Sequence, residues 1–138
     1  MSRLSDTPLD AAALAARVRS DDRGAVLVFE GVARADATAG TVVSALEYEA
    51  WGEAAERALE AIEDEARRRW PALACAVAHR VGRVDIGTPA VVIAVAAPHR
   101  DDAYAASRWL IDTLKARVPI WKKEHRADGG AAWVANRP

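Results

Sequence analysis

The alternation of helix-like and strand-like segments constrains the fold of this chain most. Residues 53–70 and 101–118 repeat apolar side chains at helical spacing, which predicts two long amphipathic helices. A proline follows each of them, at positions 71 and 119, where a helix cannot readily continue. Pairs of apolar, β-branched segments of strand length lie between and around these helices. Strand pairs separated by helices predict an α+β fold, with the helices packed on one side of a mainly antiparallel sheet.

The remaining segments complete this outline. An N-terminal helix is expected to begin at Thr7, as its cap, and Pro8, and to end before Gly24. Residues 35–41 are small and predict a mobile loop. With 138 residues, the chain is expected to form a single domain over residues 1–138. Strands are expected at residues 25–31, 42–49, 75–84 and 90–97, and a hairpin at 120–126 and 131–135.

Composition argues against several classes of function. The formal net charge of -1 gives no overall attraction to nucleic acid or to anionic lipid. The N-terminus lacks a signal-like apolar run, no segment is long enough to span a bilayer, and Cys75 is the single cysteine. His79, His99 and His125 have no ligand partner at a metal-binding spacing. We expect a cytoplasmic protein with no metal, no cofactor, no nucleic-acid partner and no membrane partner.

The distribution of basic residues points to a functional region. The chain has 16 arginines but only 3 lysines, and Lys115, Lys122 and Lys123 lie within nine residues of one another. A lysine is a compact charge that can lose its proton when burial lowers its pKa, whereas an arginine stays charged. This selective use of lysine favours proton chemistry, with a solvated basic patch as the alternative.

Two further sites for anions are suggested by position. His99 and Arg100 follow an apolar strand and begin the helix at residues 101–118, where free backbone N–H groups attract phosphate or carboxylate. Capping of that helix by Asp101 and Asp102 is the alternative interpretation. Arg34 follows the strand at residues 25–31 and lies beside the predicted loop.

Four segments resemble the catalytic, large subunit of molybdopterin synthase, a MoaE-like family. They are Phe29-Glu30-Gly31-Val32-Ala33-Arg34, Leu46-Glu47-Tyr48-Glu49-Ala50-Trp51, the His99-Arg100 pair and, most specifically, Leu114-Lys115-Ala116-Arg117-Val118-Pro119-Ile120-Trp121-Lys122-Lys123-Glu124. The resemblance covers most of the chain, from about Gly24 to Trp133. It implies an α/β hammerhead fold with a mainly antiparallel sheet and an added small β subdomain.

The resemblance also implies a function. In that family the enzyme is a sulfurtransferase of molybdenum cofactor biosynthesis. Sulfur passes from the C-terminal Gly-Gly thiocarboxylate of a small ubiquitin-like subunit to cyclic pyranopterin monophosphate (precursor Z), which forms the dithiolene of molybdopterin. The expected assembly is a homodimer of large subunits within a two-plus-two heterotetramer.

Site residues are implied position by position. Lys115 and Lys122 match the family's essential lysines and are expected to be catalytic, and Arg137 is a candidate contributor across the dimer. The expected substrate-binding residues are Val32, Ala33, Arg34, His99, Arg100, Lys115, Lys122, Lys123 and Glu124. Two alternatives stay open: a non-catalytic regulatory module that binds an organic phosphate or nucleotide, and an RNA-binding domain, which the near-neutral charge disfavours.

Overall fold

Two β-sheets and three helices make up the part of the chain that the structure, a computed structural model, describes, namely residues 2–38 and 41–134. None of these helices has both the length and the apolar character needed to cross a bilayer. The elements are β1 (Leu4–Ser5), α1 (Ala11–Val18), β2 (Ala25–Val32), β3 (Ala37–Thr38), β4 (Thr41–Ala50), α2 (Gly52–Arg69), β5 (Ala74–Arg80), β6 (Gly82–Asp85), β7 (Pro89–Ala97), α3 (Arg100–Arg117), β8 (Ile120–Arg126) and β9 (Ala131–Val134).

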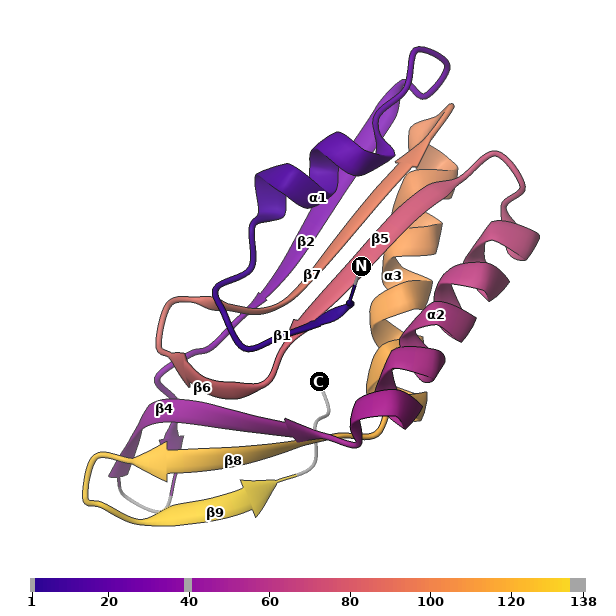
Figure 1. The fold of residues 1–138 in the computed structure, drawn as a ribbon. Coiled ribbons are helices and arrows are strands. Elements are labelled where there is room, and N and C mark those ends of the chain that lie inside the picture. Colours follow the sequence, from indigo (N-terminus) through magenta and orange to yellow (C-terminus); the bar gives the residue numbers. More distant parts are fainter. Residues whose placement is uncertain (1, 39–40, 135–138) are drawn as a thin grey trace.

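The first sheet has the strand order β1-β5-β7-β2 and forms the body of the molecule (Figure 1). Strand β1 is parallel to β5, and the other pairs are antiparallel. Strand β7 is almost entirely buried, because α2 and α3 cover one face of this sheet and α1 covers the other. Leu14 and Val18 of α1 pack on Val92 and the small residues beside it. The expectation that all helices lie on one side is therefore wrong for α1.

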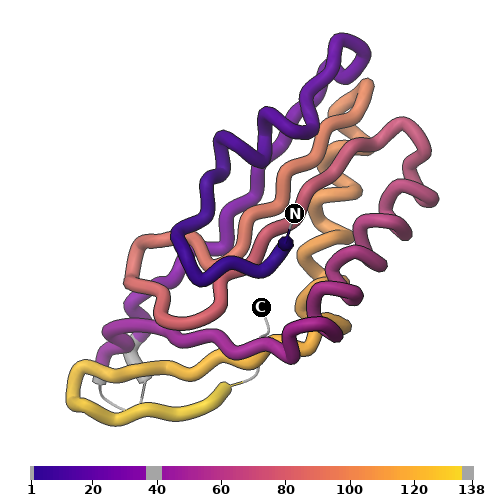
Figure 2. The backbone as a smooth tube through the Cα atoms, in the orientation of Figure 1, coloured from indigo at the N-terminus to yellow at the C-terminus, as the bar shows by residue number. Residues whose placement is uncertain are grey.

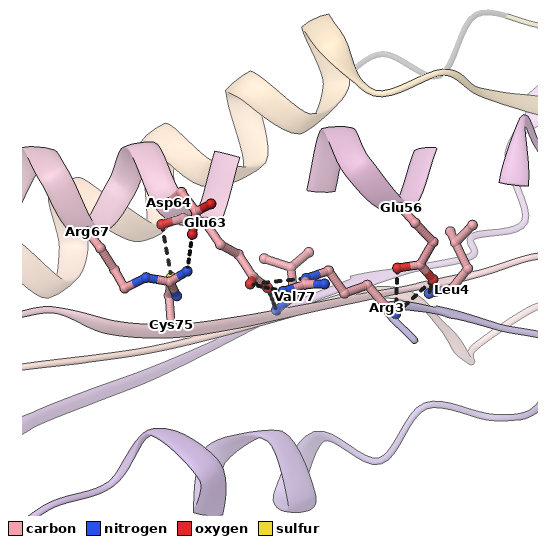
Figure 3. Close-up of polar contacts among 8 residues, drawn as sticks. All are labelled: Arg3, Leu4, Glu56, Glu63, Asp64, Arg67, Cys75 and Val77. Atoms are coloured by element: carbon pink, nitrogen blue, oxygen red, sulfur yellow. Dashed lines mark hydrogen bonds and ion pairs between the residues drawn. The ribbon is translucent and has the colours of Figure 1, made fainter. Parts of the chain in front are cut away.

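Hydrogen bonds to two carboxylates of α2 hold the N-terminal residues in place (Figure 3). Glu63, which is buried, accepts hydrogen bonds from the Arg3 guanidinium and from the backbone N–H of Val77, both at 2.9 Å. Glu56 accepts hydrogen bonds from the backbone N–H groups of Arg3 and Leu4, each at 2.9 Å. These bonds supply partners for a short parallel strand that the hydrophobic pattern did not reveal.

The single cysteine, Cys75 of β5, faces α2 and is a structural residue. The Cys75 thiol lies against α2, where the Arg67 guanidinium donates to its sulfur at 3.7 Å (Figure 3). Burial raises the pKa of Cys75 to about 11. The thiol therefore stays protonated near neutral pH, in agreement with its expected role as a small core residue.

The second sheet contains β3, β4, β8 and β9 in that order, with β6 paired to β4. It lies at one end of the first sheet, and the backbone trace in Figure 2 shows the chain crossing between the two. One crossing is at Gly82, whose φ of 82° is a left-handed conformation that favours glycine. The predicted single strand at residues 75–84 is therefore two strands, β5 and β6, in different sheets.

Most other predicted elements are confirmed. Helices α2 and α3 agree with the predicted ranges to within one residue, and β8 and β9 form the predicted antiparallel hairpin. Helix α1 begins later than predicted, since Asp10 rather than Thr7 accepts the capping hydrogen bond, from Ala13 N–H at 3.0 Å. The predicted loop at residues 35–41 includes the short strand β3, and residues 39 and 40 lie outside the described residues.

Candidate active site

A pocket of about 500 Å³ lies where the two sheets meet α3. Strands β2, β5 and β7 of the first sheet, β4 and β8 of the second, and the last turns of α3 all contribute to its walls. Its volume is in the range typical of sites that bind small molecules. The pocket therefore depends on the way the two sheets are joined, and no single segment of the chain forms it.

Lys115 and Lys122 both line this pocket. Lys115 lies in the last turn of α3 and Lys122 lies on β8; the chain reverses between them after Pro119. Burial, and then the positive charge of Lys122, lower the pKa of Lys115 to about 8. The lysine amine can thus exchange a proton near neutral pH, which an arginine at this position could not do.

Glu124, Val32 and Arg34 also line the pocket. Glu124 lies two residues after Lys122 on β8 and therefore on the same face of that strand. Arg34 follows β2, is 81% exposed, and donates to Asp36 at 2.9 Å. Five of the nine expected substrate-binding residues, namely Val32, Arg34, Lys115, Lys122 and Glu124, thus come together from three separate parts of the chain.

Ala33 and Lys123 do not line the pocket. Ala33 is buried, and its backbone joins the segment before β7, donating to the Thr88 carbonyl at 3.0 Å and accepting from Gly87 N–H at 2.8 Å. Lys123 lies on the opposite face of β8 from Lys122, with its ammonium 5.4 Å from the ring centre of Trp133. Ala33 therefore fixes the backbone that leads to Arg34, and Lys123 belongs to the outer face of the hairpin.

His99 and Arg100 are at the other end of the first sheet. They lie in a separate depression, beside Gly24 and Ala25 at the start of β2, whereas the lysine pocket adjoins Val32 at its end. Eight residues of extended strand separate these ends by roughly 25 Å. A single chain therefore does not bring this pair to the lysines, and Arg137 lies outside the described residues.

Several residues of the pocket were not predicted from the sequence. Tyr48 and His79 line it with their rings in edge-to-face contact, their centres 4.9 Å apart. On α3, Arg108 also lines it and donates to Asp112 at 2.9 Å. Helical spacing places residues 108, 112 and 115 on one side of α3, which is the sequence signal that could have found this pair.

Comparisons with known proteins identify the family of this chain. A family model described as MoaE protein matches residues 4–117. The chain belongs to the MoaE family. The chain is 44% identical over 126 residues to the molybdopterin synthase catalytic subunit of Thermoplasma volcanium, which covers 91% of this chain and 89% of that protein.

Solved structures show the same fold. The crystal structure of molybdopterin synthase from Staphylococcus aureus matches with a TM-score of 0.91 and 38% identity, over 96% of both chains. A complex of subunits 1 and 2 of the molybdopterin-converting factor from Helicobacter pylori matches with a TM-score of 0.77 at 19% identity, over 96% of this chain and 88% of that chain. The chain therefore has the MoaE fold, and it is an enzyme of molybdenum cofactor biosynthesis, the catalytic subunit of molybdopterin synthase.

Proposed function

We propose that the lysine pocket binds cyclic pyranopterin monophosphate and that sulfur is transferred to it there, twice, to form the dithiolene of molybdopterin. The observation that carries this proposal is Lys115, whose pKa of about 8 and position in the pocket suit proton transfer. The alternative of a regulatory module loses its support, because the chain is 44% identical to a catalytic subunit.

The charges of the pocket suit an anionic substrate. Asp36 and Asp112 neutralise Arg34 and Arg108, while Lys115 and Lys122 add two cations against the carboxylate of Glu124, which leaves an excess of positive charge in the lining. Attack by the thiocarboxylate sulfur forms a carbon–sulfur bond and expels an oxygen of the substrate, which needs a proton. Water must then cleave the bond between the sulfur and the tail carbonyl, which leaves a carboxylate on the tail, and both steps build negative charge that a nearby cation stabilises. We assign the proton transfer to Lys115 and the binding of the thiocarboxylate or the substrate to Lys122. Val32, Arg34 and Glu124 complete the proposed binding residues.

The proposed sulfur donor is a small ubiquitin-like subunit that ends in a Gly-Gly thiocarboxylate. The Helicobacter pylori protein with the same fold is described in a complex of subunits 1 and 2. Glycine residues have no side chains, so such a tail fits a narrow entrance. The proposed site of action is the cytoplasm, where Cys75, the one cysteine, remains a free thiol.

A homodimer of this chain is proposed from the free edge of the first sheet. Among the described residues β2 pairs only with β7, and its Val28, Phe29 and Val32 are 40%, 37% and 46% exposed. A long apolar edge strand of this kind tends to pair with another chain. If β2 pairs with its copy about a two-fold axis, the two strands run antiparallel. The end that bears His99 and Arg100 in one subunit then meets the pocket end of the other.

This arrangement accounts for the two separated groups of expected substrate-binding residues. In the proposed dimer, Lys115 and Lys122 come from one subunit, and His99 and Arg100 of the second subunit supply anion contacts at the rim of the same pocket. Each pocket would then be complete only in the dimer, and the two-plus-two heterotetramer would contain two of them.

Lys115→Ala tests the proposed chemistry. We expect it to lower the rate of dithiolene formation by about 100-fold or more, because a positioned proton donor commonly contributes that much. Lys115→Arg keeps the charge but cannot release the proton, so we expect it to remain impaired. The measurement is conversion of the cyclic pyranopterin by the complex with thiocarboxylated small subunit.

Two controls make this test specific. Arg117 lies at the same end of α3 as Lys115, but it pairs with Glu65 and does not line the pocket. Arg117→Ala should therefore keep near wild-type activity. Each variant must also form the complex with the small subunit, as judged by light scattering. Full activity of Lys115→Ala would refute the assignment, and full activity of Lys115→Arg would show that only a fixed charge is needed.

A further inference from the structure

His79 is a buried histidine of the pocket to which neither the sequence nor the family resemblance gave a role. It lies near the end of β5, its side chain is fully buried, and its ring contacts the edge of Tyr48. It also lies close enough to Lys115 for the charge of that lysine to affect its proton affinity. His79 is therefore a buried residue of the pocket wall near Lys115.

The protonation of the ring is defined by its surroundings. Nδ1 lies 2.7 Å from the carbonyl oxygen of Arg80, and because a carbonyl can only accept, Nδ1 carries the hydrogen. Burial and, to a lesser extent, the positive charge of Lys115 together lower the pKa of His79 to about 4, although the hydrogen bond to Arg80 acts in the opposite direction. The ring is therefore neutral near pH 7, and Nε2 presents a lone pair without a hydrogen.

This Nε2 acceptor has no hydrogen-bond partner among the described residues. A buried acceptor left without a partner is costly, and such groups in folded proteins generally indicate a ligand or water that completes them. The ring is held in place by its Nδ1 hydrogen bond and by Tyr48. Because His79 is also one of the residues that line the pocket, a molecule bound there can supply the missing donor.

We propose that His79 is a substrate-binding residue, whose Nε2 accepts a hydrogen bond from an N–H or O–H group of the molecule bound in this pocket. The inference rests on the proposed function, since it takes the cyclic pyranopterin as that molecule; its pterin ring and its hydroxyl groups carry such donors. Lys115 and Lys122 recognise the negative charge of the ligand, and His79 recognises a donor on its uncharged part. The pocket thereby selects a heterocyclic phosphate over a simple anion.

Two substitutions separate the two nitrogens of the ring. In His79→Asn the amide N–H can replace the Nδ1 hydrogen bond to Arg80, but nothing replaces Nε2. In His79→Gln the longer side chain brings an amide oxygen toward the position of Nε2. We expect His79→Asn to weaken binding of the cyclic pyranopterin about five- to tenfold, as loss of one hydrogen bond does, and His79→Gln to recover most of it.

Calorimetry on the full-length chain measures this binding, and steady-state kinetics in the complex with thiocarboxylated small subunit measures its consequence. A contact made equally in the ground state and the transition state should raise KM by a similar factor and leave kcat within about twofold. Unchanged binding and KM in His79→Asn would overturn the inference while leaving the proposed function intact. Failure of the wild-type chain to bind the pyranopterin would instead refute the proposed function, and the inference with it.

A measurement on the unmodified protein covers the case in which either variant fails to fold. The ¹⁵N signals of His79 in labelled wild-type chain should show an unprotonated Nε2, which moves upfield when the pyranopterin saturates the pocket. Sulfate, an anion without donors, should affect the lysine signals and leave Nε2 unchanged. A protonated Nε2 in the free protein, or an unchanged Nε2 signal in the saturated protein, would overturn the inference.

Discussion

Lys115 combines a positive charge with a partly buried position, and this combination has a thermodynamic consequence. In the unfolded chain its amine keeps a proton up to the ordinary pKa of 10.5, whereas burial and the charge of Lys122 lower the folded pKa to about 8. The unfolded state therefore binds more protons between pH 8 and 10.5, and the contribution of this group to stability rises with pH in that window. Below pH 8 the folded state carries the full cost of a half-buried ammonium.

Lys115→Met should therefore make the protein more stable while it removes activity. At pH 7 we expect the free energy of unfolding to rise by about 1–2 kcal/mol, after discounting the pKa shift for the partial exposure of the side chain. The advantage over wild type should shrink as pH rises from 8 to 10.5, because the wild-type lysine then becomes neutral. Urea unfolding at fixed protein concentration over this pH range measures both effects.

Lys123→Met is the matched control, because it removes a lysine from the opposite face of β8. Among the residues that the structure describes, the contact it loses is the one with Trp133, so it should not stabilise the protein at any pH. Equal stabilities of Lys115→Met and wild type at pH 7 would mean that the Lys115 ammonium is well solvated in the folded protein.

At the scale of elements, the contact between β2 and β7 determines the shape of the pocket wall. Gly31 of β2 faces Val91 of β7, and both line the pocket. A Cβ atom at position 31 would lie 2.5 Å from Cγ1 of Val91, far inside van der Waals contact. The pairing of the two strands also shifts between Gly31 and Val32. Glycine at this position therefore allows β2 to approach β7 closely just before the chain turns toward Arg34.

Gly31→Ala should destabilise the protein by about 1–3 kcal/mol, the usual cost of forcing an extra carbon into a packed site. Adding Val91→Ala removes the clashing methyl group, so the double variant should be more stable than the sum of the single effects predicts. Gly52→Ala, whose added Cβ meets no atom within 4 Å, should be neutral or slightly stabilising. Thermal and urea unfolding of the four variants give the comparison, and wild-type stability of Gly31→Ala would show that β7 yields easily.

The range of the contacts that form each element explains which elements could be predicted from the sequence. Periodicity located α2, α3 and the β8–β9 hairpin, since these depend on neighbours a few residues apart. It did not separate β5 from β6, because the apolar pattern continues through Gly82 and periodicity does not indicate which sheet a strand joins. For the site, the scarcity of lysine identified Lys115 and Lys122. Tyr48 and His79 were missed because they reach the pocket through long-range strand pairing.

At the scale of the whole molecule, two groups of basic side chains lie at opposite ends of one sheet. Lys115 and Lys122 are in the pocket at one end, and His99 and Arg100 are at the other, separated by roughly 25 Å of extended strand. A substrate of pterin size cannot span that distance within one subunit. If both groups bind one molecule, they belong to different subunits, and the exposed edge of β2 is the surface that would bring them together.

A mixed dimer of Lys115→Ala and Arg100→Ala chains tests this arrangement. Each pure variant should be strongly impaired, because both pockets of its dimer carry the lesion. In the mixed dimer one pocket receives both lesions and the other receives none, so a preparation purified through two different tags should recover about half of wild-type activity. The control is a mixed dimer of Lys115→Ala and Lys122→Ala chains, in which each pocket retains one lesion and no recovery is expected. If the first mixed dimer is no more active than its pure parents, His99 and Arg100 do not act across the dimer, and the depression beside them must be separate from the site of sulfur transfer.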